Sequence, residues 1–156
     1  MTTLLTTLQL TIDDIERLLI CCRCGYALPV NHSQATSHLR TNHEVSESDR
    51  RCLTRYPTSI NPNGFCNPTE APLRDDGSDA HPQLRIHDGY ACLKCSYYTV
   101  NHPELSKHIS KNHLNGQQAT RERTQDLCDG VYLQIWTHAS SWRYWRVKKD
   151  GNMIRG

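Results

Sequence analysis

Apolar residues along the chain occur in short runs that are separated by polar stretches. The longest unbroken run is Leu18–Cys22, far shorter than the roughly 20 apolar residues that cross a membrane. Ahead of this run, Thr11 can cap a helix whose first turn contains Asp13 and Asp14, since acidic residues favour the positive end of a helix dipole. The pattern therefore predicts a short helix over residues 12–19.

The C-terminal third of the chain shows the alternation that is typical of paired strands. Apolar and polar residues alternate over residues 131–136 and again over residues 142–147, with Ser140 and Ser141 between them. This pattern predicts a β-hairpin. All three tryptophans lie in it. Their mixture with arginines and lysines is compatible with a nucleic-acid surface, but packing of one face against the preceding segment is the simpler interpretation.

The middle of the chain predicts a further helix, a strand and a long loop. Ser46 followed by Asp49 resembles a capping box, and the helix that it starts would run to about Tyr56, just ahead of Pro57. Five prolines together with Asn-Gly and Asp-Gly pairs indicate a loop or linker. The other predicted elements are this loop over residues 57–83, a strand over residues 84–90 and a polar helix over residues 116–128.

Composition and the N-terminus narrow the class of protein. The 156 residues carry a formal net charge of +2 and a mean hydropathy of -0.68, so the core is thin and benefits from cross-links. Residues 1–10 contain no basic residue, unlike a secretory signal, and Asp13, Asp14 and Glu16 are unusual in a mitochondrial presequence. We therefore expect a nuclear or cytoplasmic protein with no membrane partner, whose thiols bind metal more readily than they form disulfides.

Two copies of one cysteine and histidine pattern organise the chain. The first has the spacing C-x2-C-x13-H-x4-H and the second C-x2-C-x12-H-x4-H, and each contains Val-Asn-His ahead of the two ligand histidines. Both spacings fit the Cys2His2 zinc pattern, in which two thiolates and two imidazoles surround one ion. The predicted ligands of two Zn²⁺ ions are Cys21, Cys24, His38, His43, Cys92, Cys95, His108 and His113.

This spacing also predicts the local geometry and the role of the metal. Two histidines five positions apart are about 140° out of line on a regular α-helix, so the last helical turn must tighten or loosen. Tyr90 and Leu105 are expected to pack the small core of the second copy, whereas Ala35 stands where the first copy would have the helix leucine. Four protein ligands leave no open coordination position, so we expect structural sites, no enzyme activity and no small-molecule substrate.

Alternatives remain for the other cysteines. Cys22 could replace Cys21 as a ligand, although C-x-C is the rarer turn. The cysteines without a partner at metal spacing are Cys52, Cys66 and Cys128. These three could form a third site with His81 or His87, but buried or unused thiols are the better interpretation.

Three segments in a fixed order resemble a known family. They are LICCRCGYAL over residues 19–28, DGYACLKCSY over residues 88–97 and QIW over residues 134–136. Together they resemble the fungal family named after orsellinic acid biosynthesis cluster protein D, over roughly residues 10–148. Members of that family look like paired Cys2His2-type proteins with a long spacer. The resemblance implies the same eight zinc ligands and implies no settled biochemical activity.

The helices of the two copies suggest a DNA-binding hypothesis. If the first zinc histidine of each copy is helix position 7, positions −1, 3 and 6 can be assigned as in finger–DNA complexes. They are Asn31, Gln34 and Ser37 in the first copy and Asn101, Glu104 and Lys107 in the second. Side chains of these types can read adenine, cytosine and guanine, so duplex DNA is a candidate partner. Each of the six is also an ordinary exposed helix residue.

A protein partner is the competing hypothesis. The 48 residues between His43 and Cys92 are far more than the short linker of tandem fingers, and only residues 115–156 are distinctly basic, with a net charge of +3. DNA affinity rests largely on neutralised phosphates, so few cations mean weak binding. A zinc-stabilised interaction or scaffold module without nucleic-acid binding therefore stands beside the DNA hypothesis.

The predicted fold is a small α+β domain with two zinc sites. It contains two ββα-like Cys2His2 fingers, a long Pro-rich connecting loop and a C-terminal β-hairpin that packs with the second finger. We expect four segments: a helix and first finger over residues 10–44, a helix and linker over 45–83, the second finger over 84–114, and a polar helix with the Trp-rich hairpin over 115–156.

Overall fold

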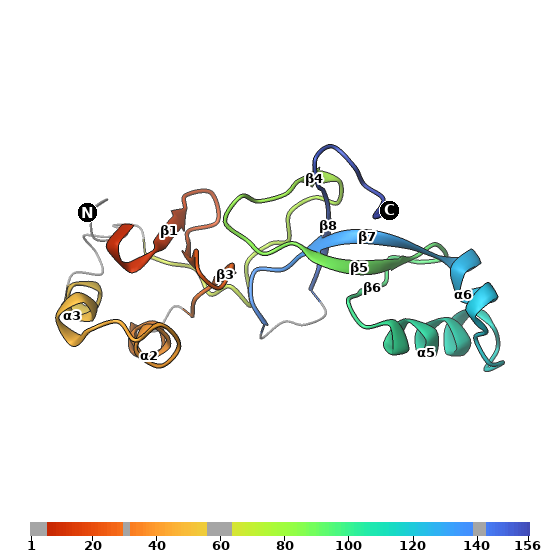
Figure 1. The fold of residues 1–156 in the computed structure, drawn as a ribbon, viewed down its shortest axis with the longest axis horizontal. Coiled ribbons are helices and arrows are strands. Elements are labelled where there is room, and N and C mark those ends of the chain that lie inside the picture. Colours follow the sequence, from red (N-terminus) through yellow and green to blue (C-terminus); the bar gives the residue numbers. More distant parts are fainter. Residues whose placement is uncertain (1–5, 30–31, 56–63, 139–142) are drawn as a thin grey trace. The chain divides into compact units, whose positions relative to one another are not determined.

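The computed structural model describes residues 6–29, 32–55, 64–138 and 143–156, and they form a mixed α+β fold with small sheets and few helices (Figure 1). The predicted α+β class is therefore confirmed. No helix in these ranges is long and apolar enough to span a membrane. The chain divides into two compact units. The first is Met1–Pro72, Pro82–Arg85 and Trp136–Ser140, and the second is Leu73–His81, Ile86–Ile135 and Ser141–Gly156. The four-segment division stays a prediction.

The first unit is built on a three-stranded antiparallel sheet. Its strands are β1 (Leu10–Asp13), β2 (Leu18–Cys21) and β3 (Tyr26–Ala27), in the order β1-β2-β3. Two helices follow in the sequence, α2 (His32–His43) and α3 (Glu47–Arg55). Buried leucines from the strands, from the segment after β3 and from α2 form the core of this unit, namely Leu10, Leu19, Leu28 and Leu39.

The helix predicted over residues 12–19 is wrong, because this segment forms the β1–β2 hairpin. The Asp13 carboxylate accepts a hydrogen bond from the Glu16 backbone N–H at 2.8 Å, so this acidic residue stabilises the turn and not a helix start. Arg17 adopts a left-handed φ of 55° in the same turn. All four residues of β2 are buried, and β2 is paired on both edges. The apolar run therefore fills an inner strand.

Helix α3 begins where the capping signal predicts it. The Ser46 hydroxyl accepts a hydrogen bond from the Asp49 backbone N–H at 3.3 Å, which satisfies one of the amides that lack a partner at the start of a helix. The helix ends at Arg55, close to the predicted end at Tyr56. Residues 56–63, including Tyr56, lie outside the described residues.

The second unit contains a five-stranded sheet. Its strands are β4 (Ser78–Asp79), β5 (His87–Cys92), β6 (Tyr98–Thr99), β7 (Cys128–Gln134) and β8 (Trp145–Lys148). Their order is β4-β8-β7-β5-β6, and every pair is antiparallel except β4 with β8. The β7–β8 pair agrees with the predicted hairpin. The predicted turn at Ser140 and Ser141 and the third tryptophan, Trp142, lie outside the described residues.

The long-range pairing of β5 with β7 is the feature that the sequence pattern did not predict. Six residue pairs join these strands, from His87 with Leu133 to Cys92 with Cys128. The strand predicted over residues 84–90 is thus shifted toward the cysteine turn, because its partner lies far along the chain. Buried side chains of β7 and β8 complete the core of this unit, namely Val131, Leu133, Trp145 and Val147.

Two capped helices lie between β6 and β7 in the sequence of the second unit. Helix α5 (His102–His113) starts at Asn101, whose side chain accepts from the Glu104 N–H, and Pro103 lies in the first turn, where a proline is tolerated. Helix α6 (Arg121–Leu127) starts at Thr120, whose hydroxyl accepts from Arg123 N–H. The helix predicted over residues 116–128 is therefore shorter, because the chain enters β7 at Cys128.

The described part of the predicted Pro-rich loop is largely irregular. Residues 64–83 contain one short strand, β4, which pairs with β8. In the first unit, the Trp136 indole N–H donates to the Pro72 carbonyl oxygen at 2.9 Å. Trp136 and Trp145 are both at most 2% exposed, so packing, the simpler of the two interpretations, accounts for them.

Candidate metal centres

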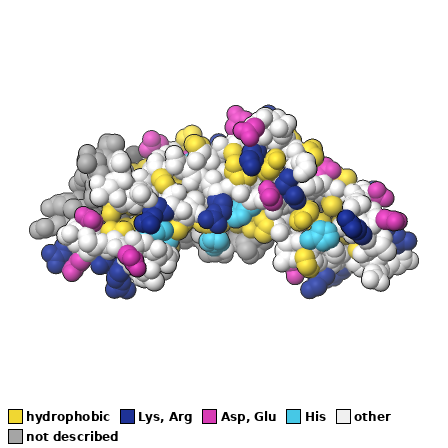
Figure 2. Space-filling model, in the orientation of Figure 1, with side chains coloured by type: hydrophobic (Ala, Val, Ile, Leu, Met, Phe, Trp, Pro, Cys, Tyr) yellow, Lys and Arg dark blue, Asp and Glu magenta, His cyan; other side chains and the backbone are white. Residues whose placement is uncertain are grey.

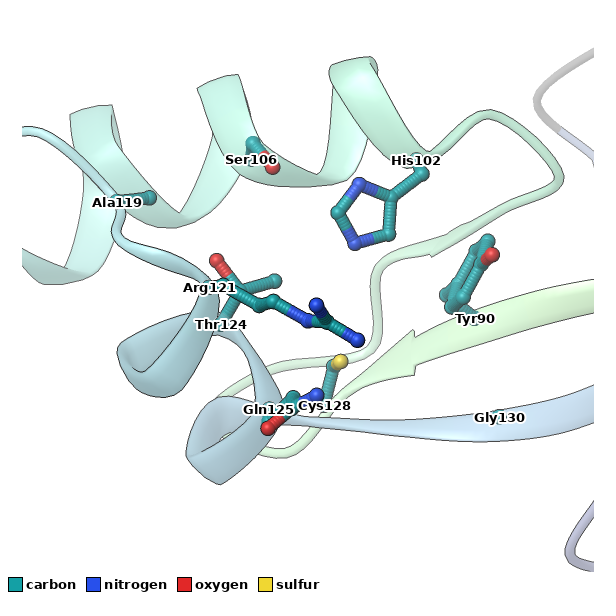
Figure 3. A pocket seen from close by; sticks show the side chains of 9 residues that line it. All are labelled: Tyr90, His102, Ser106, Ala119, Arg121, Thr124, Gln125, Cys128 and Gly130. Atoms are coloured by element: carbon teal, nitrogen blue, oxygen red, sulfur yellow. The ribbon is translucent and has the colours of Figure 1, made fainter. Parts of the chain in front are cut away.

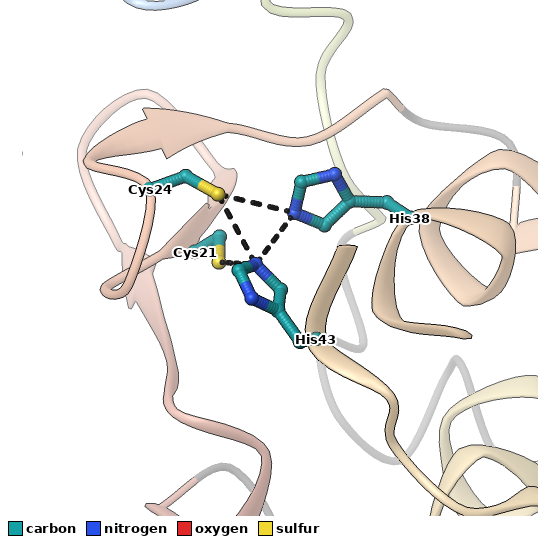
Figure 4. Close-up of side chains that lie close together, drawn as sticks. All are labelled: Cys21, Cys24, His38 and His43. Atoms are coloured by element: carbon teal, nitrogen blue, oxygen red, sulfur yellow. Dashed lines mark hydrogen bonds between the residues drawn. The ribbon is translucent and has the colours of Figure 1, made fainter. Parts of the chain in front are cut away.

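The first Cys2His2 group comes together at the end of β2 and on α2. Cys21 ends β2, Cys24 lies in the turn after it, and α2 supplies His38 and His43. Their four ligand atoms lie within 4.8 Å of one another. Figure 4 shows the two sulfurs and two rings pointing toward one point. His43 Nε2 lies 3.3 Å from Cys21 Sγ, 3.1 Å from Cys24 Sγ and 3.1 Å from His38 Nε2.

A glycine allows the tight turn that carries Cys24. The Gly25 N–H donates to the Cys21 carbonyl oxygen at 2.8 Å, and Gly25 has a φ of +76°, a conformation that other residues rarely adopt. A Cβ at this position would lie 2.7 Å from the Arg85 backbone nitrogen. The close approach of residue 85 and the left-handed turn therefore both require glycine.

The second group is assembled from the equivalent parts of the chain. Cys92 ends β5, Cys95 lies in the following turn, and α5 supplies His108 and His113. The sulfur of Cys92 lies 3.3 Å from His113 Nε2, and the sulfur of Cys95 lies 3.2 Å from His108 Nε2. The two Nε2 atoms are 3.3 Å apart. These four atoms also lie within 4.8 Å of one another.

The end of α5 loosens in the way that the histidine spacing requires. The Leu114 N–H donates to the Ile109 carbonyl oxygen at 3.1 Å, a bond that spans five residues instead of four. Asn115 then adopts a left-handed φ of 53°. In the first unit, Glu44 has a similar φ of 52° directly after His43. Both helices therefore end at the second histidine, which lets two residues five apart face one point.

The distances in both groups fit a tetrahedral zinc ion. With Zn–S near 2.3 Å and Zn–N near 2.0 Å, adjacent S and N ligands of a tetrahedron lie about 3.5 Å apart. The sulfur–nitrogen distances given above for the two groups span 3.1–3.3 Å, and further contacts reach 3.5 and 3.6 Å. Two thiols with two imidazoles are also the donor set that Zn²⁺ prefers. Both groups are compatible with one zinc ion each.

Burial shifts the pKa values of several side chains in the two groups. It lowers the pKa of His38, His43 and His108, and neighbouring positive charge lowers it further, so these rings favour the neutral form that binds metal. Burial is also the main cause that raises the pKa of the Cys24 and Cys95 thiols. A metal ion that binds here must therefore displace thiol protons.

An asparagine lies beside the outer nitrogen of the first histidine in each group. The Asn42 side-chain amide lies 2.9 Å from His38 Nδ1, and the Asn112 amide lies 3.2 Å from His108 Nδ1. These contacts hold each ring so that Nε2 faces the ligand group. A ring that binds metal through Nε2 carries its proton on Nδ1, so with zinc bound the amide would turn its oxygen to accept that proton, as partners of ligand histidines do. Neither asparagine was predicted to have a role in the sites. The pattern that could have indicated one is the Asn-His dipeptide that both copies share, Asn42-His43 and Asn112-His113.

The remaining cysteines stand apart from the two groups. The first group contains Cys21, while the neighbouring Cys22 is exposed and outside it. In the part of the chain that the structure describes, only these two groups of three or more Cys, His, Asp or Glu come within metal-binding distance. The alternative of a third site is therefore not found there, and the Cys52 side chain lies outside that part. Burial, with charge from Asp129 and Cys92, raises the pKa of the half-buried Cys128.

The residues predicted to contact nucleic acid are only partly described. Asn31 and the Gln34 side chain lie outside the described part, and Ser37 is exposed on α2. On α5, Asn101 caps the helix. Glu104 and Lys107 form an exposed ion pair of 3.7 Å, with 54% and 78% of their side chains exposed. Their role in nucleic-acid binding stays a prediction.

Comparison with known proteins gives one family. Residues 9–114 match the family described as orsellinic acid/F9775 biosynthesis cluster protein D, which confirms the resemblance carried by the cysteine segments. Neither the curated proteins nor the solved structures gave a match. Since the matched residues make up more than half of the sequence, the chain belongs to the orsellinic acid/F9775 biosynthesis cluster protein D family.

Proposed function

We propose that the chain is a zinc-binding protein whose two Cys2His2 centres each hold one Zn²⁺ ion in a finger-like unit. The support is that both centres have the same order of elements, two strands followed by a helix that supplies both histidines: β2, β3 and α2, then β5, β6 and α5. With four protein ligands, each ion would be structural, linking strand and helix. The proposed role is therefore binding and not catalysis.

We further propose that the outward faces of α2 and α5 bind nucleic acid, with duplex DNA as the expected partner. The observation that carries this proposal is the exposure of the α5 face that fingers use for base contact. Glu104 and Lys107 lie on it, and Lys111 follows one turn later and is also exposed. On α2, Ser37 and Arg40 are exposed at the corresponding part of the helix. Such a partner would favour a nuclear location.

The charge distribution sets the expected strength of this binding. On the face shown in Figure 2, Lys and Arg side chains are spread over the described surface and alternate with acidic ones. A protein that neutralises few phosphates has weak non-specific affinity with a shallow salt dependence. Any useful DNA binding by this chain must therefore come from base contacts, and sequence selection is the experiment that detects them.

The test is selection of binding sites from a random duplex DNA pool by zinc-loaded protein near physiological salt. We expect short enriched sites, and we expect Lys107→Ala to weaken binding to them by about 1–3 kcal/mol and to relax the preference at one base pair. Lys94→Ala is the matched control, because Lys94 is an exposed lysine of the same unit in the turn before Cys95 and not on the helix. An equal loss of DNA affinity in both variants would mean that the lysine charge, and not a base contact, accounts for the binding.

A protein partner is the second candidate, and one observation favours it. The three predicted contact residues of the second copy have partners within the chain: Asn101 caps α5, and Glu104 pairs with Lys107. A base-reading role would have to break these interactions. No enriched DNA sequence, together with weak binding that vanishes as salt rises, would favour a zinc-stabilised protein-interaction module.

A further inference from the structure

We propose that Cys128 is a redox partner of the zinc ligand Cys92 and that a disulfide between them releases the metal from the second centre. This inference rests on the proposed occupation of that centre by zinc. Cys128 belongs to neither Cys2His2 group. It is the first residue of β7 and lies directly opposite Cys92, the last residue of β5.

The pairing of the two strands puts these cysteines in the position that suits a cross-strand disulfide. The Cys92 N–H donates to the Tyr97 carbonyl oxygen, away from β7. The next residue, Leu93, donates to the Leu127 carbonyl oxygen at 2.8 Å. In an antiparallel ladder, hydrogen-bonded and non-hydrogen-bonded pairs alternate, so Cys92 and Cys128 form a non-hydrogen-bonded pair. In such pairs the Cα atoms lie about 4.5 Å apart and the side chains leave the same face of the sheet, within the range that disulfides span.

A pocket gives a small oxidant access to Cys128. It has a volume of about 580 Å³ and is lined by residues of α5, α6, β5 and β7 and by Ala119 from the segment between the two helices. Figure 3 shows the Cys128 sulfur pointing into it, below the guanidinium of Arg121 and the ring of His102. None of its lining residues is acidic. Cys92 itself is only 5% exposed, so an oxidant that enters the pocket meets the Cys128 thiol first.

The reaction balances with hydrogen peroxide as the oxidant. The two sulfurs lose one electron each and form the S–S bond. The O–O bond of the peroxide breaks, and its oxygens leave as two water molecules with two protons, one from the Cys128 thiol and one from solvent. The zinc ion keeps its oxidation state and dissociates, because the oxidised Cys92 sulfur is no longer a thiolate ligand.

The first centre provides an internal contrast. There the ligand Cys21 lies opposite Leu10 on β1 and Tyr26 on β3. Neither of these strand neighbours can form a disulfide, so among the strands that the structure describes Cys92 is the one ligand cysteine with a cysteine directly opposite it.

The experiment compares zinc-loaded wild-type protein with the variants Cys128→Ser and Cys66→Ser. Cys66 is the control, since it is a half-buried thiol outside both groups, as Cys128 is. Each protein is treated with hydrogen peroxide, zinc release is followed with a chromogenic chelator, and remaining thiols are alkylated before trypsin digestion. Cys92 and Cys128 then fall in separate peptides, residues 86–94 and 124–143, and Cys95 falls in a third.

We expect wild type and Cys66→Ser to lose about one zinc ion per chain and to yield the linked peptides 86–94 and 124–143. Cys128→Ser should keep that ion several-fold longer, and a thiol reductant with added zinc should restore the wild type. Equal zinc loss from Cys128→Ser, or Cys92 found joined to Cys95, would overturn the proposal. If the purified protein contained no zinc, the proposed zinc-binding function would be wrong. The same peptide analysis of the metal-free chain would still report whether the disulfide between Cys92 and Cys128 forms.

Discussion

The two candidate metal centres present the same four ligand types but differ in the residues that surround them. Tyr26 and Tyr97 each lie two residues after the second cysteine of their copy. Tyr97 stacks on the ligand ring of His108, with centroids 4.0 Å apart and planes 11° apart. Tyr26 instead contacts the ring of His138, at 3.8 Å, and lies under the Arg85 guanidinium. The same motif position therefore supports the metal site in one unit and holds a distant chain segment in the other.

The helices of the two centres also differ in how they are anchored. Both place a fully buried residue one position after the first ligand histidine, Leu39 in α2 and Ile109 in α5. Helix α5 adds Leu105, also fully buried, where the first copy has Ala35. Although the two helices are packed differently, the four ligand atoms of each group lie within 4.8 Å of one another. The same ligand geometry is thus reached with different packing around it, as expected if a bound zinc ion fixes the four ligands.

The largest effect should come from removing one ligand of either centre. We expect His38→Ala and His108→Ala each to lose about one zinc ion and to unfold mainly their own unit, because metal binding of about 10–16 kcal/mol in finger peptides is coupled to folding. Native mass spectrometry gives the zinc content and circular dichroism the loss of structure. Loss of both ions from either variant would show that the two centres are not independent.

A core substitution should then make the second copy resemble the first. Leu105→Ala removes a fully buried side chain and should lower the free energy of unfolding of the second unit by about 2–5 kcal/mol. Leu39→Ala removes the fully buried leucine of α2, the counterpart of Ile109, and should destabilise the first unit instead. Hydrogen exchange during denaturant titration distinguishes the units. A Leu105→Ala protein as stable as wild type would mean that zinc alone holds α5.

The asparagines beside the ligand rings should have a smaller and symmetrical effect. We expect Asn42→Ala and Asn112→Ala each to weaken zinc binding at the adjacent centre by about 10–100-fold, because partners that orient ligand histidines contribute that much. Competition with a chelator of known affinity measures the change. Thr41→Ala, an exposed neighbour of Asn42, should bind zinc as wild type does. An effect at only one centre would make the two asparagines functionally different.

The smallest effect should come from the cap of α5. Asn101→Ala removes the side chain that accepts from the Glu104 N–H at 3.1 Å and should cost about 1 kcal/mol of stability. Asn101→Asp keeps an acceptor at this position and should be nearly neutral. Thermal denaturation of both variants measures the difference. If Asn101→Ala were neutral but weakened DNA binding, Asn101 would act as a contact residue and not as a cap.

Local patterns in the sequence predicted the sites better than the sheets. The C-x2-C turns and the histidines five apart are short-range signals, so the eight residues that meet in the structure could be named from spacing alone. The start of α3 at Ser46 is local in the same sense. Residues 12–19 misled the prediction, because Asp13 serves a turn as readily as a helix start. The β5–β7 pairing depends on residues about 40 positions apart, which no local pattern encodes.

The β5–β7 pairing has a consequence for how this protein can be shortened without loss of its fold. The family match ends at residue 114, but β5 lies between β6 and β7 as an inner strand of its sheet. Arg155 also reaches back to donate to the Gly89 carbonyl oxygen at 3.0 Å. A protein shortened to the matched region would leave one edge of β5 without its partner, and an open edge of this kind recruits strands from other molecules. The boundary of shared sequence is thus not a boundary at which the protein can be divided, and expression of the matched region alone is expected to give aggregates.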